Sequence, residues 1–181
     1  TIPLKKDFSV NSPWGNIRLK GPFPNYHVTG LVQTEGNNLP VAEWNFSANG
    51  DLQQLNTINL KGLLLGGHLD VTGNVNFAEE FKWDLLLTGK NIKPRAKDVI
   101  QFKAKNIGVI KNKNLLTTLT LNEIKGTVQG LPVSGQGSLV LQNQNVIFEN
   151  IKINLGKAFL FVDGYIKDMW QVQWNIDIPQ F

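Results

Sequence analysis

Apolar and polar residues alternate one by one through most of this chain. The clearest stretch is 172–178, where apolar and polar residues take turns: Val172, Trp174, Ile176 and Ile178 against Gln173, Asn175 and Asp177. Successive side chains of a β-strand point to opposite faces of its sheet, so a period of two predicts a strand with one apolar face. Roughly a dozen such stretches recur at intervals of about 8–12 residues. The pattern therefore predicts an all-β protein with little helix.

Glycine, asparagine and proline divide the predicted strands. We expect turns at 36–38, 49–51, 66–67 and 130–132, because Asn and Gly accept the positive φ that tight hairpins need. Four prolines before residue 26 leave room only for short edge strands, at Phe8–Val10 and Asn16–Lys20, and for a loop at 22–24. The remaining predicted strands are 27–35, 41–48, 55–65, 68–75, 81–87, 115–121, 125–129, 137–142, 146–155, 158–166 and 172–178.

Residues 90–114 interrupt the alternation. Basic side chains gather around Pro94, and the sequence from about Pro94 to Val99 favours a short helix. We expect a strand at 102–104 and a turn at 111–114. The segment 95–114 is therefore interpreted as an insertion that separates two units.

A repeated segment supports this division. Leu60–Gly73, with Trp83 ten residues later, aligns without a gap to Ile151–Gly164, with Trp174 ten residues later. Repeats on this scale indicate stacked structural units. We therefore predict one β domain over 1–181, with unit 1 at about 28–94, unit 2 at about 115–181, and Trp83 and Trp174 on the same, concave face.

Composition narrows the possible functions. The 181 residues are 41% hydrophobic and 18% charged, with a net charge of +4, and the only arginines are Arg18 and Arg95. Surfaces that read bases or clamp phosphates usually depend on arginine, which disfavours nucleic acid as a partner. Cysteine is absent, and no apolar run approaches the roughly 18 residues of a membrane helix. Because the chain starts at Thr1, we expect a fragment of a longer protein, with its targeting signal elsewhere.

The glycine pattern resembles that of TamB-like proteins in the wider AsmA-like group. The likeness lies in the ordered series of strand, glycine turn and closing strand across 119–178, and a first copy runs from Trp44 to Pro94. It covers roughly residues 28–181 in two copies. The positions that match are Gly126, Gly130, Pro132, Gly135, Gly137, Gly156 and Gly164.

This resemblance implies a protein of the Gram-negative periplasm, whose parent chain is anchored in the inner membrane by a segment absent here. It implies an elongated, curled antiparallel or mixed sheet that forms an open, β-taco-like trough. The implied roles are phospholipid transport between the two membranes and support of outer-membrane protein assembly, including that of autotransporters. The implied partners are phospholipid acyl chains, a TamA-type outer-membrane protein and unfolded outer-membrane clients.

The alternation itself leaves two packings open. The sheet either folds on itself as a sandwich with a dry core, or stays open as a trough that leaves apolar surface for a ligand. In the trough, acyl chains would contact the apolar side chains of the alternating strands. These are Trp44, Phe46, Phe81, Trp83, Leu85, Leu87, Ile151, Ile153, Leu155, Val172, Trp174, Ile176 and Ile178.

Other chemistries have less support. His68 and Asp70 share a strand face and could form a base and its orienting partner, but no cysteine or suitable serine accompanies them. We expect an ordinary polar pair, no catalysis, no cofactor and no metal, since no ligand spacing is present. Anionic lipid headgroups are candidates for contact with the basic cluster, and a solvated loop is the simpler interpretation. That cluster is Lys90, Lys93, Arg95 and Lys97.

A second function remains open. The end strands of a trough have unpaired edges, and such an edge can template an added strand. The protein would then be a chaperone or scaffold for outer-membrane β-proteins, without lipid conduction. Charges inside the trough should impair lipid transfer, whereas prolines near Ile17 or Ile176 should impair strand templating.

Overall fold

The computed structural model describes residues 10–36, 39–167 and 169–179. Within these ranges the chain forms twelve strands and no helix. Their bounds are β1 Val10–Lys20, β2 Tyr26–Gly36, β3 Leu39–Gly50, β4 Gln54–Leu64, β5 Gly67–Asn76, β6 Phe81–Ile92, β7 Val99–Lys111, β8 Asn114–Val128, β9 Leu131–Gln142, β10 Asn145–Leu155, β11 Ala158–Ile166 and β12 Trp170–Asp177.

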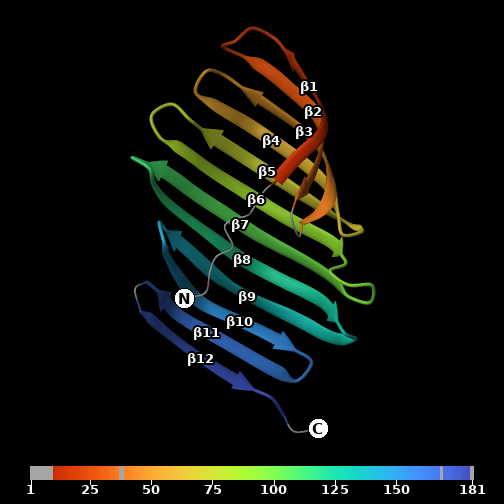
Figure 1. Cartoon of the computed structure of the whole chain (residues 1–181), viewed down its shortest axis with the longest axis vertical. Helices are drawn as coiled ribbons and strands as arrows, with labels where there is room; N and C mark the ends of the chain where they lie inside the picture. The colour runs from red at the N-terminus through yellow and green to blue at the C-terminus, as the bar shows by residue number, and fades with distance from the viewer. Residues whose placement is uncertain (1–9, 37–38, 168, 180–181) are drawn as a thin grey trace.

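The strands form a single sheet in which each strand pairs with the next along the chain (Figure 1). Every pair is antiparallel. The predicted all-β fold class is therefore confirmed, in its antiparallel and not its mixed form. Short hairpin connections explain this order, since two antiparallel neighbours need only a tight turn between them.

The sheet is an open single layer. Among the described residues, substantial contacts join only consecutive strands, so no second layer of these residues covers either face. In Figure 1 the first part of β1 crosses in front of the sheet, while the later strands continue below as an open surface. This arrangement fits a trough and excludes the sandwich that the alternation had left open.

Bulges interrupt several of the strand pairs. In β4, β6 and β10 the register shifts at residues with positive φ, which are Thr57 at 53°, Asn91 at 54° and Asn150 at 50°. A bulge adds an unpaired residue, bends its strand and increases the local twist. These positions therefore bend single strands locally, while the sheet as a whole is open and lacks the curl that was expected.

The predicted turn at Asn49–Asp51 is wrong by about two residues. Asn49 and Gly50 still belong to β3, and the chain reverses at Asp51–Gln53. The Asp51 carboxylate accepts hydrogen bonds from the N–H groups of Gln53, at 2.7 Å, and Gln54, at 3.0 Å. Side-chain bonds of this kind define the turn, so the Asn-Gly pair was not its centre.

The turn predicted at 130–132 is also displaced. The chain reverses at Gln129 and Gly130, with φ of 53° and 80°. Pro132 lies inside β9, opposite Thr127, and its carbonyl accepts a hydrogen bond from the N–H of Gly156. The stretch 125–129 is not a separate strand, because β8 continues through a bulge after Leu121.

The predicted helix from Pro94 to Val99 is wrong. Residues 93–98 form a short connection between β6 and β7, closed by a hydrogen bond from the Asp98 N–H to the Arg95 carbonyl. Asp98 is buried, and its carboxylate accepts a hydrogen bond from the N–H of Gln129. The segment 95–114, predicted as an insertion, contains β7, which pairs with both β6 and β8. The division into two units stays a prediction.

The N-terminal region forms one edge strand. Asn16–Lys20 is the second half of β1, and Pro13 lies at a register shift in its first half, as expected for an edge. The loop at 22–24 is confirmed. The predicted strand at Phe8–Val10 and the turn at 36–38 lie largely outside the described residues.

Candidate functional site

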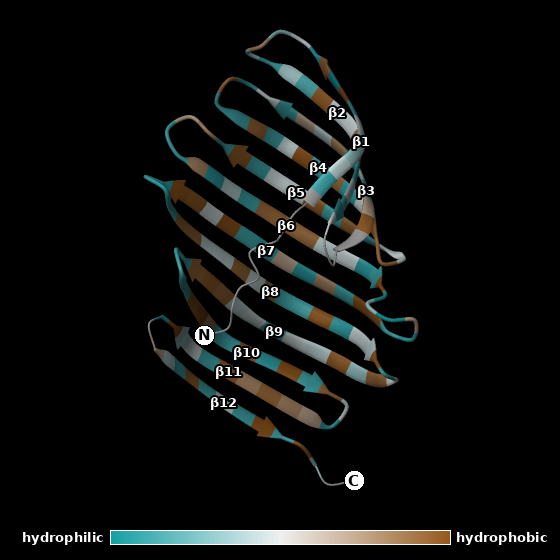
Figure 2. Ribbon diagram, in the orientation of Figure 1, coloured by the Kyte–Doolittle hydropathy of each residue, from teal (hydrophilic) through white to brown (hydrophobic). Residues whose placement is uncertain are grey.

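Nearly all the predicted groove residues lie on one face of the sheet, the apolar face. Directly paired residues on neighbouring strands share a face. One unbroken cross-strand row on this face runs over β3–β8 as Phe46, Leu60, Val71, Leu87, Ala104 and Leu121. Ile178, the exception among the predicted residues, follows the end of β12. Hydrophobic and hydrophilic residues alternate along the strands in Figure 2, as this arrangement requires.

The structure confirms that Trp83 and Trp174 share a face. A second cross-strand row starts at Trp83 and reaches Trp170 of β12 through Gly108, Thr117, Leu141, Val146 and Ile166. Trp174 lies four residues after Trp170 on the same strand, and so on the same face. The two copies of the repeat are equivalent hairpins, β4–β5 and β10–β11, each with a two-residue turn.

Aromatic rings pack against glycines of neighbouring strands on this face. A β-carbon added at Gly62 would overlap the Trp44 ring, and one added at Gly108 would overlap the Trp83 ring. The same relation joins Phe46 to Gly30 and Phe102 to Gly89. A ring that covers a glycine packs against the exposed backbone there, as in aromatic rescue of sheet glycines. Sequence reasoning identified the tryptophans but not these glycines, whose signal is only their cross-strand register.

Polar side chains on the apolar face hold two of the tryptophans by hydrogen bonds. The Trp83 Nε1–H donates to Asn106 Oδ1 at 2.6 Å, and Asn106 Nδ2 donates to Thr117 Oγ1 and the Thr118 carbonyl. Trp44 Nε1–H similarly donates to Thr34 Oγ1 at 2.7 Å. These bonds satisfy the indole N–H groups inside an otherwise apolar surface. They therefore hold both rings down on the sheet.

The apolar face is largely uncovered. Among the described residues, only Ala42, Ala48, Val71, Ile92 and Ala104 are buried hydrophobic residues. Trp174 on the edge strand is 68% exposed. Soluble monomers seldom leave continuous apolar surface larger than a few hundred Å². A face of this kind therefore calls for a partner or ligand with apolar surface of its own.

The apolar face is hollowed at its N-terminal corner, where a cavity of about 520 Å³ opens. We call it the corner cavity. Its walls combine strand residues of β1–β4 with side chains from three hairpin connections. The lining residues are Ile17, Leu19, Phe23, Tyr26, Val28, Phe46, Asp51, Leu52, Leu55 and Phe77. Apart from Phe46, none of them was among the predicted groove residues, and the loop residues Phe23, Leu52 and Phe77 carry no alternation to reveal their face.

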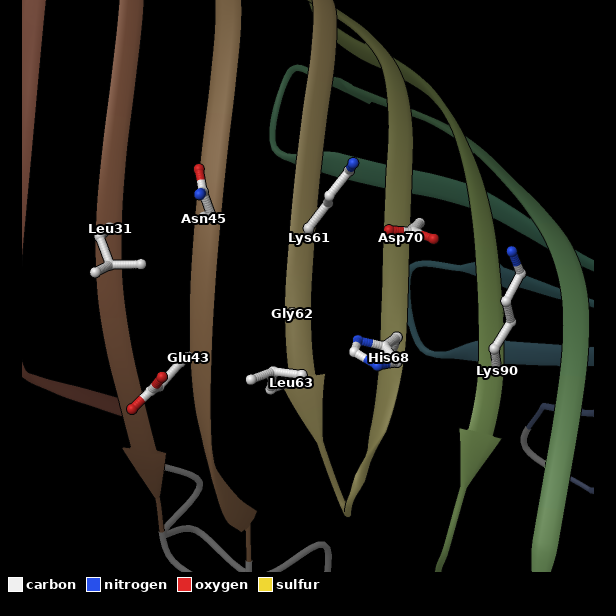
Figure 3. A pocket seen from close by; sticks show the side chains of 9 residues that line it. All are labelled: Leu31, Glu43, Asn45, Lys61, Gly62, Leu63, His68, Asp70 and Lys90. Carbon is white, nitrogen blue, oxygen red and sulfur yellow. The ribbon is translucent and has the colours of Figure 1, made fainter.

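The opposite face is mainly polar and carries a shallow pocket of about 430 Å³ (Figure 3). His68 and Asp70 both point from it, as their spacing predicted, together with Lys61 and Lys90. No hydrogen bond joins the His68 ring to the Asp70 carboxylate, although the structure describes both. This face also carries some apolar side chains: Val140 and Ile147 are cross-strand neighbours, and Thr118 separates Val140 from Ile107 in the same row.

The predicted basic cluster is split by the fold. Lys90 is on the polar face of β6, whereas Lys93, Arg95 and Lys97 are exposed in the connection after it. That connection and the corner cavity lie at opposite ends of the strands. Because a strand rises about 3.3 Å per residue, the twelve residues of β6 separate them by roughly 40 Å.

Nowhere in 10–36, 39–167 and 169–179 do three His, Asp or Glu side chains converge as metal ligands would. In the same ranges no helix has the length and apolar character to cross a bilayer.

A long, open antiparallel sheet with one largely uncovered apolar face defines an elongated, single-layer β-protein. The family model for the N-terminal domain of TamB matches residues 1–181, the whole chain. The chain belongs to this family, which indicates a role in biogenesis of the Gram-negative envelope. Comparison with curated proteins and with solved structures gave no match.

Proposed function

We propose that the apolar face shields phospholipid acyl chains as they pass between the inner and outer membranes. The observation that carries the proposal is the continuity of this face, whose cross-strand rows run through interior strands without a charged side chain. Each methylene removed from water contributes about 0.8 kcal/mol, so an acyl chain gains several kcal/mol from contact with such a surface. An apolar face selects weakly for chain shape, which suits a conduit.

Membership of the TamB family supports the cellular location and the partner that we propose for this role. We place the protein in the periplasm, with its parent chain anchored in the inner membrane. A TamA-type outer-membrane protein is the proposed partner, with support of outer-membrane protein and autotransporter assembly as the wider role. The proposed role is not catalytic and needs no cofactor.

Neighbouring leucines on β6 allow a direct test. Leu87 lies on the apolar face between Val71 and Ala104, and Leu86 lies on the polar face between Thr72 and Lys105. Leu87→Asp should reduce the phospholipid that copurifies with the chain at least tenfold, because the charge loses its hydration beside acyl chains. Leu86→Asp should leave it unchanged. The idea fails if Leu87→Asp folds, by circular dichroism, and still carries normal phospholipid.

One observation supports strand templating as a second function. The edge strand β1 carries Pro13, a bulge, Arg18 and Lys20, which discourage pairing with another chain. The other edge strand, β12, has no proline or lysine. Half of its backbone N–H and C=O groups point away from β11 and can pair with an added strand.

The two functions respond differently to mutation. If β12 templates strands of outer-membrane proteins, Ile176→Pro should abolish binding of an extended, alternating peptide, while Leu87→Asp leaves it intact. Surface plasmon resonance with such a peptide measures both. Binding that survives Ile176→Pro argues against templating at this edge.

A further inference from the structure

We infer that the corner cavity is a lateral entry site that holds one acyl chain of a phospholipid at the rim of the sheet. The inference deepens the proposed function, because it specifies where a chain meets the apolar face. The cavity lies where the β1–β2, β3–β4 and β5–β6 hairpins end, at the upper left of Figure 1. Its volume of about 520 Å³ falls within the range of about 300–1,000 Å³ for sites of small ligands.

The three hairpins extend the apolar surface beyond the strand ends. Phe23, Leu52 and Phe77 come from successive connections on the same side of the sheet, and they are 71%, 67% and 40% exposed. Exposed apolar side chains at hairpin ends are unusual, because such turns are commonly polar. The next connection on this side consists of Asn112 and Lys113, so the apolar rim is confined to the corner.

Hydrogen bonds hold this rim in place. The Phe77 N–H donates to the Gln53 carbonyl at 2.7 Å, which joins the β5–β6 connection to the β3–β4 connection. Asp51, the only charged residue of the lining, directs its carboxylate into its own turn, where the N–H groups of Gln53 and Gln54 and the Gln54 side chain donate to it. The cavity therefore exists before a ligand arrives and offers that ligand no free charge.

The lining identifies the occupant as an acyl chain and not as a polypeptide. Beyond Asp51, the Tyr26 hydroxyl is the only other polar side-chain group among the lining residues. A peptide in this cavity would lose hydration of its N–H and C=O groups and find few partners, which is costly, whereas an acyl chain has no such groups. The floor residue Phe46 also begins the cross-strand row on the apolar face, so a chain entering here continues onto that face.

The test compares photo-crosslinking from two positions in the full chain, in vesicles of phosphatidylethanolamine and phosphatidylglycerol. A photoreactive residue replaces either Leu52, in the corner cavity, or Leu85, on the apolar face of β6. A third variant with the same group at Leu63, which is exposed on the polar face, gives the background. We expect phospholipid adducts from Leu52 and Leu85, each at least tenfold above those from Leu63.

The outcomes separate this inference from the proposed function. Adducts from Leu85 but not from Leu52 overturn the entry site and leave the apolar face as the lipid surface. Adducts from Leu52 alone support the cavity and count against conduction along the face. Adducts from neither position overturn both, and protein adducts from Leu52 show a polypeptide occupant and overturn the inference.

Substitutions that keep the fold give an independent measurement. Phe23→Ser and Leu52→Ser remove exposed loop side chains, so they should leave the unfolding midpoint unchanged. Each should weaken binding of spin-labelled stearic acid about tenfold, because apolar contact area is lost. Leu63→Ser, the matched change on the polar face, should bind as the parent chain does. Equal affinity in all three variants overturns the inference.

Discussion

The two copies of the repeated segment place their tryptophans in different surroundings. Trp83 is in the interior strand β6, half-buried, with its ring across Gly108 and its N–H bonded to Asn106. Trp174 occupies the matching position of the edge strand β12 and is 68% exposed. The same sequence pattern thus gives a fixed floor residue where a neighbouring strand is present and an uncovered ring where none is.

This difference shows what the repeat encodes. The alternation sets the face to which each tryptophan points, since that depends only on its own strand. The position of the ring depends on the next strand, which supplies both the glycine beneath Trp83 and the amide that holds it. The floor of the trough is therefore a property of strand pairs and not of single strands.

The largest predicted effect comes from removing each tryptophan in turn. Trp83→Ala should destabilise the chain by about 2–4 kcal/mol, because it removes a large side chain packed against the sheet. Trp174→Ala should cost less than about 1 kcal/mol, because its ring packs against little. Urea unfolding followed by circular dichroism measures both. Equal losses would contradict the interior–edge difference.

A smaller loss of stability should follow from displacing the Trp83 ring from the sheet. Gly108→Ala places a methyl group where the ring lies, and we expect a loss of about 1–3 kcal/mol. Gly15→Ala on β1 is the control, since its β-carbon would meet Val32 at 3.4 Å, an ordinary contact. Differential scanning calorimetry should show a lowered melting temperature for Gly108→Ala alone.

Loss of the Asn106 side-chain amide that holds Trp83 should destabilise the chain by a similar or smaller amount. Asn106→Leu leaves the indole N–H without its acceptor and should cost about 1–2 kcal/mol. Tryptophan fluorescence should also change, because the ring is released from the sheet. Thr34→Val makes the equivalent change beside Trp44, and it should have the same direction of effect. An unchanged spectrum for Asn106→Leu would show that Gly108 alone sets the ring position.

The smallest predicted effect on stability comes from the ion pairs of Glu80, which lies between the first repeated segment and Trp83. Hydrogen bonds from Lys111, at 2.6 Å, and Lys82, at 3.0 Å, lower the pKa of Glu80. A lowered folded-state pKa gives stability that is present above the unfolded value of about 4.3 and is lost as the pH falls through the folded value. Glu80→Gln should therefore be less stable than the parent chain at pH 6. The two should converge near pH 3, and a constant difference across this range would exclude the ion pair as its cause.

The sequence predicted the fold well where the face to which a side chain points depends only on its position in its own strand. The alternation at 172–178 identified β12 and its apolar face, and the alternation at 41–48 identified β3. It failed where backbone bonds decide, as at Asp51, whose carboxylate fixes the turn, and at 93–98, where Asp98 binds the N–H of Gln129 across the chain. No local sequence pattern predicts hydrogen-bond partners of this kind.

The candidate site shows the same division. Trp44, Trp83 and Leu87 were placed on the correct face by period alone. Phe23, Leu52 and Phe77 were not found, because three connections far apart in sequence converge only once the hairpins are aligned. Gly62 and Gly108 were missed because their role depends on the ring of the neighbouring strand.

Crosslinking from Leu85 and Leu86 tests the central claim most directly. These adjacent leucines of β6 point to opposite faces, so one photoreactive residue placed at either position samples both sides of the same strand. In Gram-negative cells we predict phospholipid adducts from position 85 and few or none from position 86. Equal adducts from the two positions, or more from position 86, would contradict the claim that the apolar face carries the lipid.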